Sequence, residues 1–247
     1  MNKAWLTSLA FTIIVSHFYA HETSYLDLDS SSFEFEFSKA DLLGQISPAS
    51  HPSFSNVPIR LCSRSGVYLR TEVLEAFEGL YSAASDEGIE LIIVSGMRNF
   101  NHQKSIWERK WERPQYMGWS KVSKAIDILT YSSMPGSSRH HWGTDFDLNS
   151  LDNNFFESGD GLIIYDFLSR CAGEFGFKQV YSDDVNRTGY KEEKWHWSYM
   201  PIAEEMLKAY NSTISIDDFS GFNGSSVADS IDVLKLYVNG IDLCDFK

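Results

Sequence analysis

Apolar residues recur at helical spacing in several parts of the chain, and short apolar runs lie between them. One set recurs at intervals of three to four residues, namely Val73, Phe77, Leu80 and Ala84. This spacing predicts a helix over about 68–84, and Gly88 beyond it would prevent the helix from continuing. By similar patterns we expect further helices at 101–111, 164–175 and 201–210, and short strands at 90–94, 143–148, 177–181 and 195–199. The middle of the chain therefore combines helices with short strands.

The two ends of the chain have a different character. A short apolar run follows Lys3, and Ala20 suits a cleavage site, as is typical of a secretory signal peptide; the alternative is a buried N-terminal helix. Apolar runs on both sides of Asn239-Gly240 predict a hairpin near the C-terminus. We therefore divide the chain into a signal peptide (1–20), an irregular arm (21–60), a main domain (61–210) and a C-terminal extension (211–247). Within the arm, one stretch of alternating apolar and polar residues at 33–37 could be an edge strand.

Composition and charge restrict the classes of function. Of the 247 residues, 43% are hydrophobic and 15% aromatic, as expected for a globular protein with one substantial core. The formal net charge of −13 argues against nucleic-acid binding, because such a surface repels phosphate backbones. No later stretch approaches about 18 apolar residues, so we expect no stable membrane insertion after signal removal. Cys62, Cys171 and Cys244 allow one disulfide but are not spaced as zinc ligands.

Two short segments about fifty residues apart carry the candidate chemistry, at 138–147 and 193–197. Between them they contain His140, Asp147 and His196, which are the ligand types of a catalytic zinc site that keeps its fourth position for water. Zinc would lower the pKa of that water toward about 7, which makes hydroxide available at neutral pH. Glu193 would then accept a proton and pass it to the departing amine. The hypothesis requires that the two segments meet in space.

The same residue types also occur in purely structural roles. His141 is a second candidate ligand beside His140, and a single histidine near a tryptophan more often packs than binds metal. Asp145 and Asp147 share one face of a strand, where they could compete for metal or simply cap the strand end. Glu193 lies three residues before the second histidine, so a turn must intervene if both face one ion.

The two segments together resemble the signature of the zinc D-alanyl-D-alanine carboxypeptidases. This family includes the vancomycin-resistance dipeptidases and carboxypeptidases and shares its fold with the hedgehog signalling domain. The first segment follows Ser-x-His-x-x-Gly-x-x-x-Asp from Ser138 to Asp147, and the second follows Glu-x-Trp-His from Glu193 to His196. The similarity extends through 68–70, 93–98 and Gln103 and covers roughly residues 40–210.

The resemblance implies a role for each matching residue. The implied zinc ligands are His140, Asp147 and His196, and the implied catalytic base is Glu193. Arg98, which follows an apolar strand and a glycine turn, would steady the substrate carbonyl or the oxyanion rather than be an ordinary surface arginine, with Gln103 and Ser138 as supporting substrate-binding residues. Most relatives have a small residue where this chain has Asp145.

We therefore expect an α+β fold of the hedgehog/DD-peptidase type, in which a small, mainly antiparallel sheet carries one catalytic Zn²⁺ and helices pack against it. The expected activity is that of a secreted metallopeptidase, periplasmic or extracellular, which removes terminal D-alanine from peptidoglycan stem peptides. The alternatives are an L,D-carboxypeptidase, a peptidoglycan endopeptidase, and a zinc-containing module that binds the wall without catalysis. The oligomeric state is left open.

Overall fold

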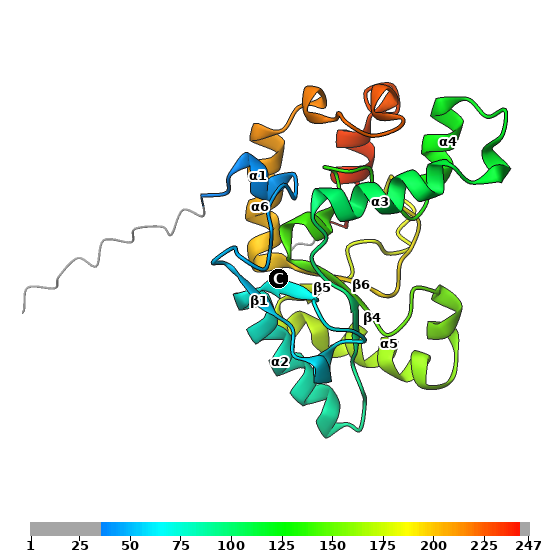
Figure 1. Ribbon diagram of the computed structural model, residues 1–247. Coiled ribbons are helices and arrows are strands. Elements are labelled where there is room, and N and C mark those ends of the chain that lie inside the picture. Colours follow the sequence, from blue (N-terminus) through cyan, green and yellow to red (C-terminus); the bar gives the residue numbers. More distant parts are fainter. Residues whose placement is uncertain (1–35, 243–247) are drawn as a thin grey trace, which may run out of the picture. The chain divides into compact units, whose positions relative to one another are not determined.

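A computed structural model of the protein describes residues 36–242, which combine helices with two antiparallel sheets (Figure 1). The helices are α1 (Lys39–Leu42), α2 (Thr71–Asp86), α3 (Phe100–Trp111), α4 (Lys121–Ile128), α5 (Gly159–Cys171) and α6 (Met200–Thr213). The predicted signal peptide, and the residues 33–35 of the alternating stretch, lie outside the described residues. Among the described residues, no helix has the length and apolarity required to cross a membrane.

The larger sheet has four strands in the order β3-β4-β6-β5, and every neighbouring pair is antiparallel. Its strands are β3 (Ile93–Ser95), β4 (Asp145–Leu148), β5 (Phe177–Lys178) and β6 (His196–Tyr199). A second, two-stranded sheet joins β1 (Phe54–Asn56) to β2 (Tyr68–Arg70). The predicted α+β fold with a small antiparallel sheet is confirmed.

The helix predicted from residue 68 begins three residues later. Tyr68–Arg70 form strand β2, and α2 starts at Thr71. Val67 and Leu69 are buried with Tyr68 less so between them, which is the period of a strand, and pairing with β1 holds these residues extended. Helical spacing of the later apolar residues could not reveal this, because the strand is only three residues long.

One face of the central strand pair is polar and the other apolar. The register of β4 and β6 pairs Asp145 with Ser198, Phe146 with Trp197, and Asp147 with His196. Because successive side chains of a strand point to opposite faces, the first and third pairs share one face and the aromatic pair lies on the other. All six side chains are buried, so the polar face is covered as completely as the apolar one.

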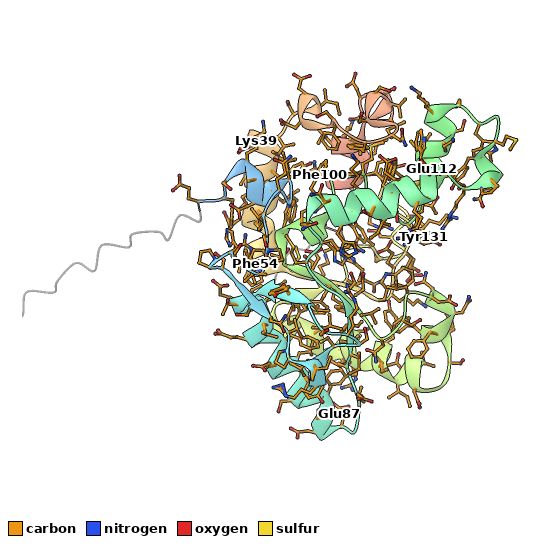
Figure 2. All side chains as sticks on the ribbon, viewed as in Figure 1. Lys39, Phe54, Glu87, Phe100, Glu112 and Tyr131 are labelled. Carbon is orange, nitrogen blue, oxygen red and sulfur yellow. The ribbon has the colours of Figure 1, made fainter. Side chains whose placement is uncertain are left out.

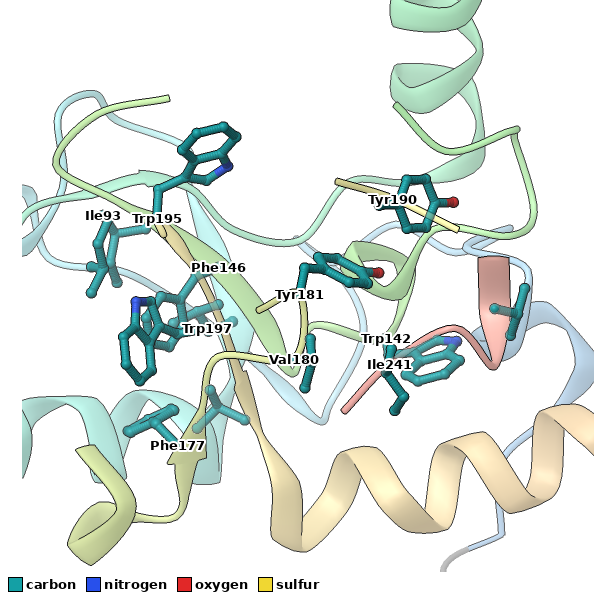
Figure 3. Close-up of a cluster of buried hydrophobic side chains, with 14 of the residues drawn as sticks. Ile93, Trp142, Phe146, Phe177, Val180, Tyr181, Tyr190, Trp195, Trp197 and Ile241 are labelled. Atoms are coloured by element: carbon teal, nitrogen blue, oxygen red, sulfur yellow. The ribbon is translucent and has the colours of Figure 1, made fainter. Parts of the chain in front are cut away.

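The apolar face packs against helix α2. Phe146 contacts Phe77 of α2 and Phe177 of β5, with ring centroids 5.2 and 5.1 Å apart. Figure 3 shows Phe146, Phe177 and Trp197 gathered in one cluster, with Ile93 of the edge strand beside them. This cluster fixes the position of β4 and β6, and so of the polar side chains on their opposite face.

A short 3₁₀ turn at Arg139–Trp142 lies beside the polar face and is held from several directions. The Arg70 side chain donates from Nε to the carbonyl of Trp142 (2.8 Å), and the Arg70 backbone N–H donates to the carbonyl of Gly143 (3.1 Å). The Trp142 indole N–H donates to the carbonyl of Leu42 (3.2 Å). Strand β2 and helix α1 therefore both position this turn, which carries the first histidine of the candidate site.

The hairpin predicted in the C-terminal extension is wrong. Leu234–Val238 form a short π-helical segment instead. In this form Val233 is buried, and the ring of Tyr237 lies against that of Tyr190 with centroids 5.2 Å apart. A strand would have placed Lys235 on the same face as Val233 and Tyr237, so packing of the apolar side chains favours the helical form.

The C-terminal extension packs on α3, where the Trp107 indole N–H donates to the carbonyl of Asn223 (2.7 Å). The division of the chain into domains stays a prediction. Cys62 and Cys171 are free thiols, and Cys244 lies outside the described residues.

We predict that Gly143→Ala destabilises the protein more than Gly66→Ala. Both glycines have a left-handed backbone, with φ of 71° and 73°, so alanine costs each about 1–2 kcal/mol in backbone strain. A Cβ at Gly143 would also lie 2.3 Å from Cε1 of Phe54, whereas nothing lies within 4 Å of one at Gly66. Overpacking should cost the Gly143 variant a further 1–3 kcal/mol or so. Urea unfolding measures both, and equal losses would contradict the argument.

Candidate metal centre

The two candidate segments meet at the polar face of the sheet. Asp147 and His196 are cross-strand partners, and Oδ1 of Asp147 lies 3.2 Å from Nδ1 of His196. The same Oδ1 lies 3.4 Å from Nε2 of His140, on the neighbouring turn. One ligand atom from each of the three residues lies within 4.8 Å of the others, and all three side chains are buried. The arrangement therefore has the compactness of a metal site.

His140 presents an unprotonated nitrogen to this cluster. Its Nδ1 lies 2.8 Å from the carbonyl oxygen of Gly96, which can only accept, so Nδ1 carries the proton. Nε2 is buried and has no hydrogen-bond partner. Two acceptors, this nitrogen and the carboxylate of Asp147, thus face each other at 3.4 Å. A cation between them would satisfy both.

His196 is held between two carboxylates. Nε2 lies 2.9 Å from Oδ2 of Asp145, and Nδ1 faces Asp147. Burial alone would lower the pKa of His196, but the hydrogen bonds with Asp145 and Asp147 raise it to about 9. The proton on Nδ1 therefore stands where a metal ion would bind and must leave first.

The donor set fits zinc. Ligands about 2.0–2.1 Å from a tetrahedral ion lie roughly 3.4 Å from one another, close to the two measured separations from Asp147. Burial alone would raise the pKa of Asp147, but His140, His196 and Arg98 hold it well below its usual range, so the carboxylate is ionised. Two imidazoles and one carboxylate are a ligand set of catalytic zinc sites.

Glu193 lies beside the cluster on the turn that leads into β6. The backbone N–H of His196 donates to the carbonyl of Glu193 (3.2 Å), which is the turn that their spacing required. Oε2 of Glu193 lies 3.6 Å from Nδ1 of His196. Burial, and to a smaller extent the charge of Asp147, raise the pKa of Glu193 to about 7 against the pull of His196 and Arg98. Its carboxyl group can therefore exchange a proton near neutral pH.

Arg98 approaches the cluster at the carboxylate of Asp147. Its Nη1 lies 3.9 Å from Oδ2 of Asp147, and its Nε is buried without a hydrogen-bond partner. Its backbone N–H donates to the carbonyl of His140 (3.1 Å), which ties the turn after β3 to the metal-binding turn. The side chain is 20% exposed, so the guanidinium is accessible from the cavity beside the cluster.

Ser138 and Gln103 occupy different positions. Ser138 lines a cavity of about 20 Å³ next to the cluster, and its Oγ is buried without a partner. Gln103 lies one layer behind this cavity, where its Nε2 donates to the carbonyl of Ser133 (2.8 Å), a residue of the cavity wall. Ser138 therefore faces the same small cavity as His140 and His196, whereas Gln103 supports its wall.

The second candidate histidine faces away from the cluster. Nδ1 of His141 donates to the carbonyl of Arg98 (2.6 Å), and Nε2 accepts from the backbone N–H of Gly136 (3.0 Å). With both nitrogens engaged, His141 has none left for a metal, and burial lowers its pKa to about 3. Asp145 likewise faces the outer nitrogen of His196 rather than the cluster.

A groove of about 670 Å³ runs past the cluster. Its lining includes the basic residues Arg98, Arg109 and Lys110, and also Leu151, Asn153, Asn154 and Trp195. Tyr131, which lies below α3 in Figure 2, lines both the groove and the small cavity. Apart from Arg98, sequence reasoning missed these residues, because they come from separate segments that only the fold brings to one groove.

Comparison with known proteins gives a consistent result. Residues 66–202 match the profile of the VanY family, D-alanyl-D-alanine carboxypeptidase, and include the whole ligand cluster, Glu193 and Arg98. A D-alanyl-D-alanine carboxypeptidase of Enterococcus faecalis is 27% identical over 143 residues, 58% of this chain and 52% of that protein. The Bacillus subtilis protein YodJ is 30% identical over 142 residues, 54% of this chain and 46% of that protein. The alignments therefore span about half the length of these curated relatives.

The fold also matches a solved structure. The LD-carboxypeptidase LdcB superposes with a TM-score of 0.50 over 81% of both chains, at 20% sequence identity. At this identity the likeness concerns the fold alone.

We predict that Glu193 makes the metal-free protein less stable as pH rises from about 4.5 to about 7. In this range the folded protein binds more protons at Glu193 than the unfolded chain does, so deprotonation favours unfolding. Glu193→Gln removes the effect and should gain roughly 3 kcal/mol in free energy of unfolding relative to wild type between pH 4.5 and pH 8. Denaturation with a chelator present measures this gain, and parallel pH profiles would contradict the raised pKa.

Proposed function

Because this chain belongs to the VanY family of D-alanyl-D-alanine carboxypeptidases, we propose that it removes terminal D-alanine from peptidoglycan stem peptides in a zinc-dependent reaction. The observation that carries the proposal is the buried cluster of His140, Asp147 and His196, with Glu193 on one side and Arg98 on the other. This is the set of groups that hydrolysis of a peptide bond requires: a metal site, a base and a cation for the developing oxyanion.

The three ligand residues would hold zinc, which supplies Lewis-acid chemistry and makes water a better nucleophile at neutral pH. Glu193 accepts a proton from the attacking water and delivers one to the departing amine. A carboxyl group with a pKa of about 7 is suited to both transfers, because neither its acid nor its base form is strongly favoured near neutral pH.

Arg98 supports the same step by charge. Arg98 lines both the groove and the small cavity at the ligands, so it can reach the carbonyl of a peptide that lies in the groove beside them. As negative charge develops on the carbonyl oxygen, a fixed cation in a poorly solvated site stabilises it more than water would.

A groove that could hold a stem peptide reaches the ligand cluster. It has about 670 Å³, and Asp147 and Glu193 of the site form part of its lining. The cavity of about 20 Å³ among His140, His196 and Ser138 has room for about one water molecule. A stem peptide can therefore lie in the groove with its scissile bond beside the ligands, where a water could attack it.

The groove offers cations to an acidic peptide, although the protein as a whole carries a net charge of −13. Arg98, Arg109 and Lys110 line it together with three carboxyl groups, of which Asp147 and Glu193 belong to the proposed metal site and Asp152 does not. Lys110 donates from Nζ to the hydroxyl of Ser132, which holds its ammonium at the groove wall. Stem peptides carry free carboxylates, which these cations would attract. Since such peptides lie in the cell wall, the proposal includes export of the enzyme by the signal peptide at 1–20.

Mass spectrometry of muropeptides incubated with the zinc-loaded protein tests the function. Loss of one alanine from pentapeptide stems, abolished by a chelator, is the expected result. Loss of alanine from tetrapeptides instead would make the enzyme an L,D-carboxypeptidase, and splitting of cross-linked dimers would make it an endopeptidase. Binding of wall fragments without cleavage, by protein that contains zinc, would contradict an enzymatic function.

Two variants should separate catalysis from metal binding. Glu193→Gln should retain zinc but lose about a hundred- to ten-thousandfold in kcat, since it removes the proton acceptor without removing a ligand. His196→Ala should lose both zinc and activity. Zinc content by atomic emission and steady-state kinetics measure both effects. A Glu193→Gln rate near wild type, or full zinc occupancy in His196→Ala, would remove that residue from its assigned role.

A further inference from the structure

Asp145 is a fully buried carboxylate that lies outside the cluster of the three candidate ligands. It shares the polar face of the sheet with Asp147, two residues further along β4. Both of its oxygens are engaged. Oδ2 accepts from Arg139 Nε (2.9 Å) and His196 Nε2 (2.9 Å), and Oδ1 accepts from Thr144 Oγ1 (2.6 Å) and Ser198 Oγ (2.9 Å).

The charge of Asp145 is balanced by Arg139. The Arg139 side chain is 1% exposed, donates from Nη2 to Ser198 (2.6 Å) and lies over the ring of Trp142 with its Cζ 4.7 Å from the centroid. A buried carboxylate without a partner would be strongly unfavourable, and here the guanidinium supplies that partner. The pair thus adds a carboxylate beside the metal site with little change in the net charge of its surroundings.

Asp145 determines which nitrogen of His196 is free for a metal. Because the carboxylate can only accept, it keeps the proton on Nε2, so Nδ1, which faces Asp147 and the centre of the cluster, is the nitrogen that a metal would use once its own proton has left. A ligating histidine whose other nitrogen donates to a carboxylate is more basic and is held in one orientation, and such outer contacts typically contribute 10- to 100-fold to metal affinity.

We propose that Asp145 is a positioning residue for the metal ligand His196, and that Arg139 holds Asp145 in place for this purpose. The inference rests on the proposed function only in that the metal is taken to be zinc. It assigns a role in metal binding to a residue that is not itself one of the three candidate ligands. It also explains why Asp145 does not compete for the ion, since its four hydrogen bonds leave neither oxygen free.

The test compares zinc affinity in three variants with that of wild type. Asp145→Asn keeps the shape of the side chain but removes its charge. Arg139→Gln/Asp145→Ala removes the carboxylate together with its countercharge, so that no unpaired charge is buried if the single variant fails to fold. Ser198→Ala is the matched control, because it removes buried hydrogen bonds to Asp145 and Arg139 but keeps the contact between Asp145 and His196.

Competition with a chromophoric chelator measures the dissociation constant for zinc, and the absorption spectrum of the cobalt-substituted protein reports the ligand geometry. Thermal unfolding of the metal-free variants verifies that each one folds. We expect Asp145→Asn to bind zinc about 10- to 100-fold more weakly, the double variant at least as weakly, and both to show a changed cobalt spectrum. Ser198→Ala should stay within about twofold of wild type.

Wild-type affinity and an unchanged cobalt spectrum in the folded Asp145 variants would overturn the inference. So would an equal loss in Ser198→Ala, since the network would then act on the fold rather than on His196. These outcomes differ from failure of the proposed function, which would appear as wild-type protein that binds zinc but cleaves no muropeptide. Wild-type protein that binds no zinc would contradict both.

Discussion

The antiparallel pairing of β4 with β6 is the constraint on which the rest of the site depends. Because side chains alternate along both strands, one register places Asp147 beside His196 on one face and Phe146 beside Trp197 on the other. The apolar face is fixed by packing against α2 and β5. A shift of the register by one residue would turn carboxylates into this apolar core and aromatic rings toward the buried polar face. The hydrophobic core thus determines the geometry of the polar cluster.

Burial of so many charged groups on one face requires that each has a partner. Asp145 has Arg139, and His196 lies between two carboxylates, but Nε2 of His140 faces Asp147 with no proton between them. This unsatisfied contact is what a divalent cation would complete. The turn that carries His140 is held by the Arg70 side chain and by the backbone of Arg98. Elements far apart in the sequence therefore position the ligands together.

The spaces at the cluster differ in size. A groove of about 670 Å³ reaches Asp147 and Glu193, whereas the cavity among His140, His196 and Ser138 has room for about one water molecule. Helix α3 contributes Lys110 to the groove and, one layer behind the small cavity, Gln103. The positions of Asp147 and His196 thus depend on the sheet, whereas the groove beside them depends on α3 and the loop after β4.

Local patterns in the sequence determined most of the elements and the kinds of chemistry available. Helical spacing predicted α2, α3, α5 and α6, and residue types predicted a nitrogen and oxygen ligand set, because both depend on neighbours along the chain. The tertiary structure alone decided between adjacent candidates. His140 and His141 have the same chemistry, and carbonyl groups more than forty residues away at Gly96 and Arg98 determine where each ring points. The helical form of Leu234–Val238 and the hydrogen bonds of Asp145 with His196 and Ser198 likewise depend on tertiary packing that no local pattern contains.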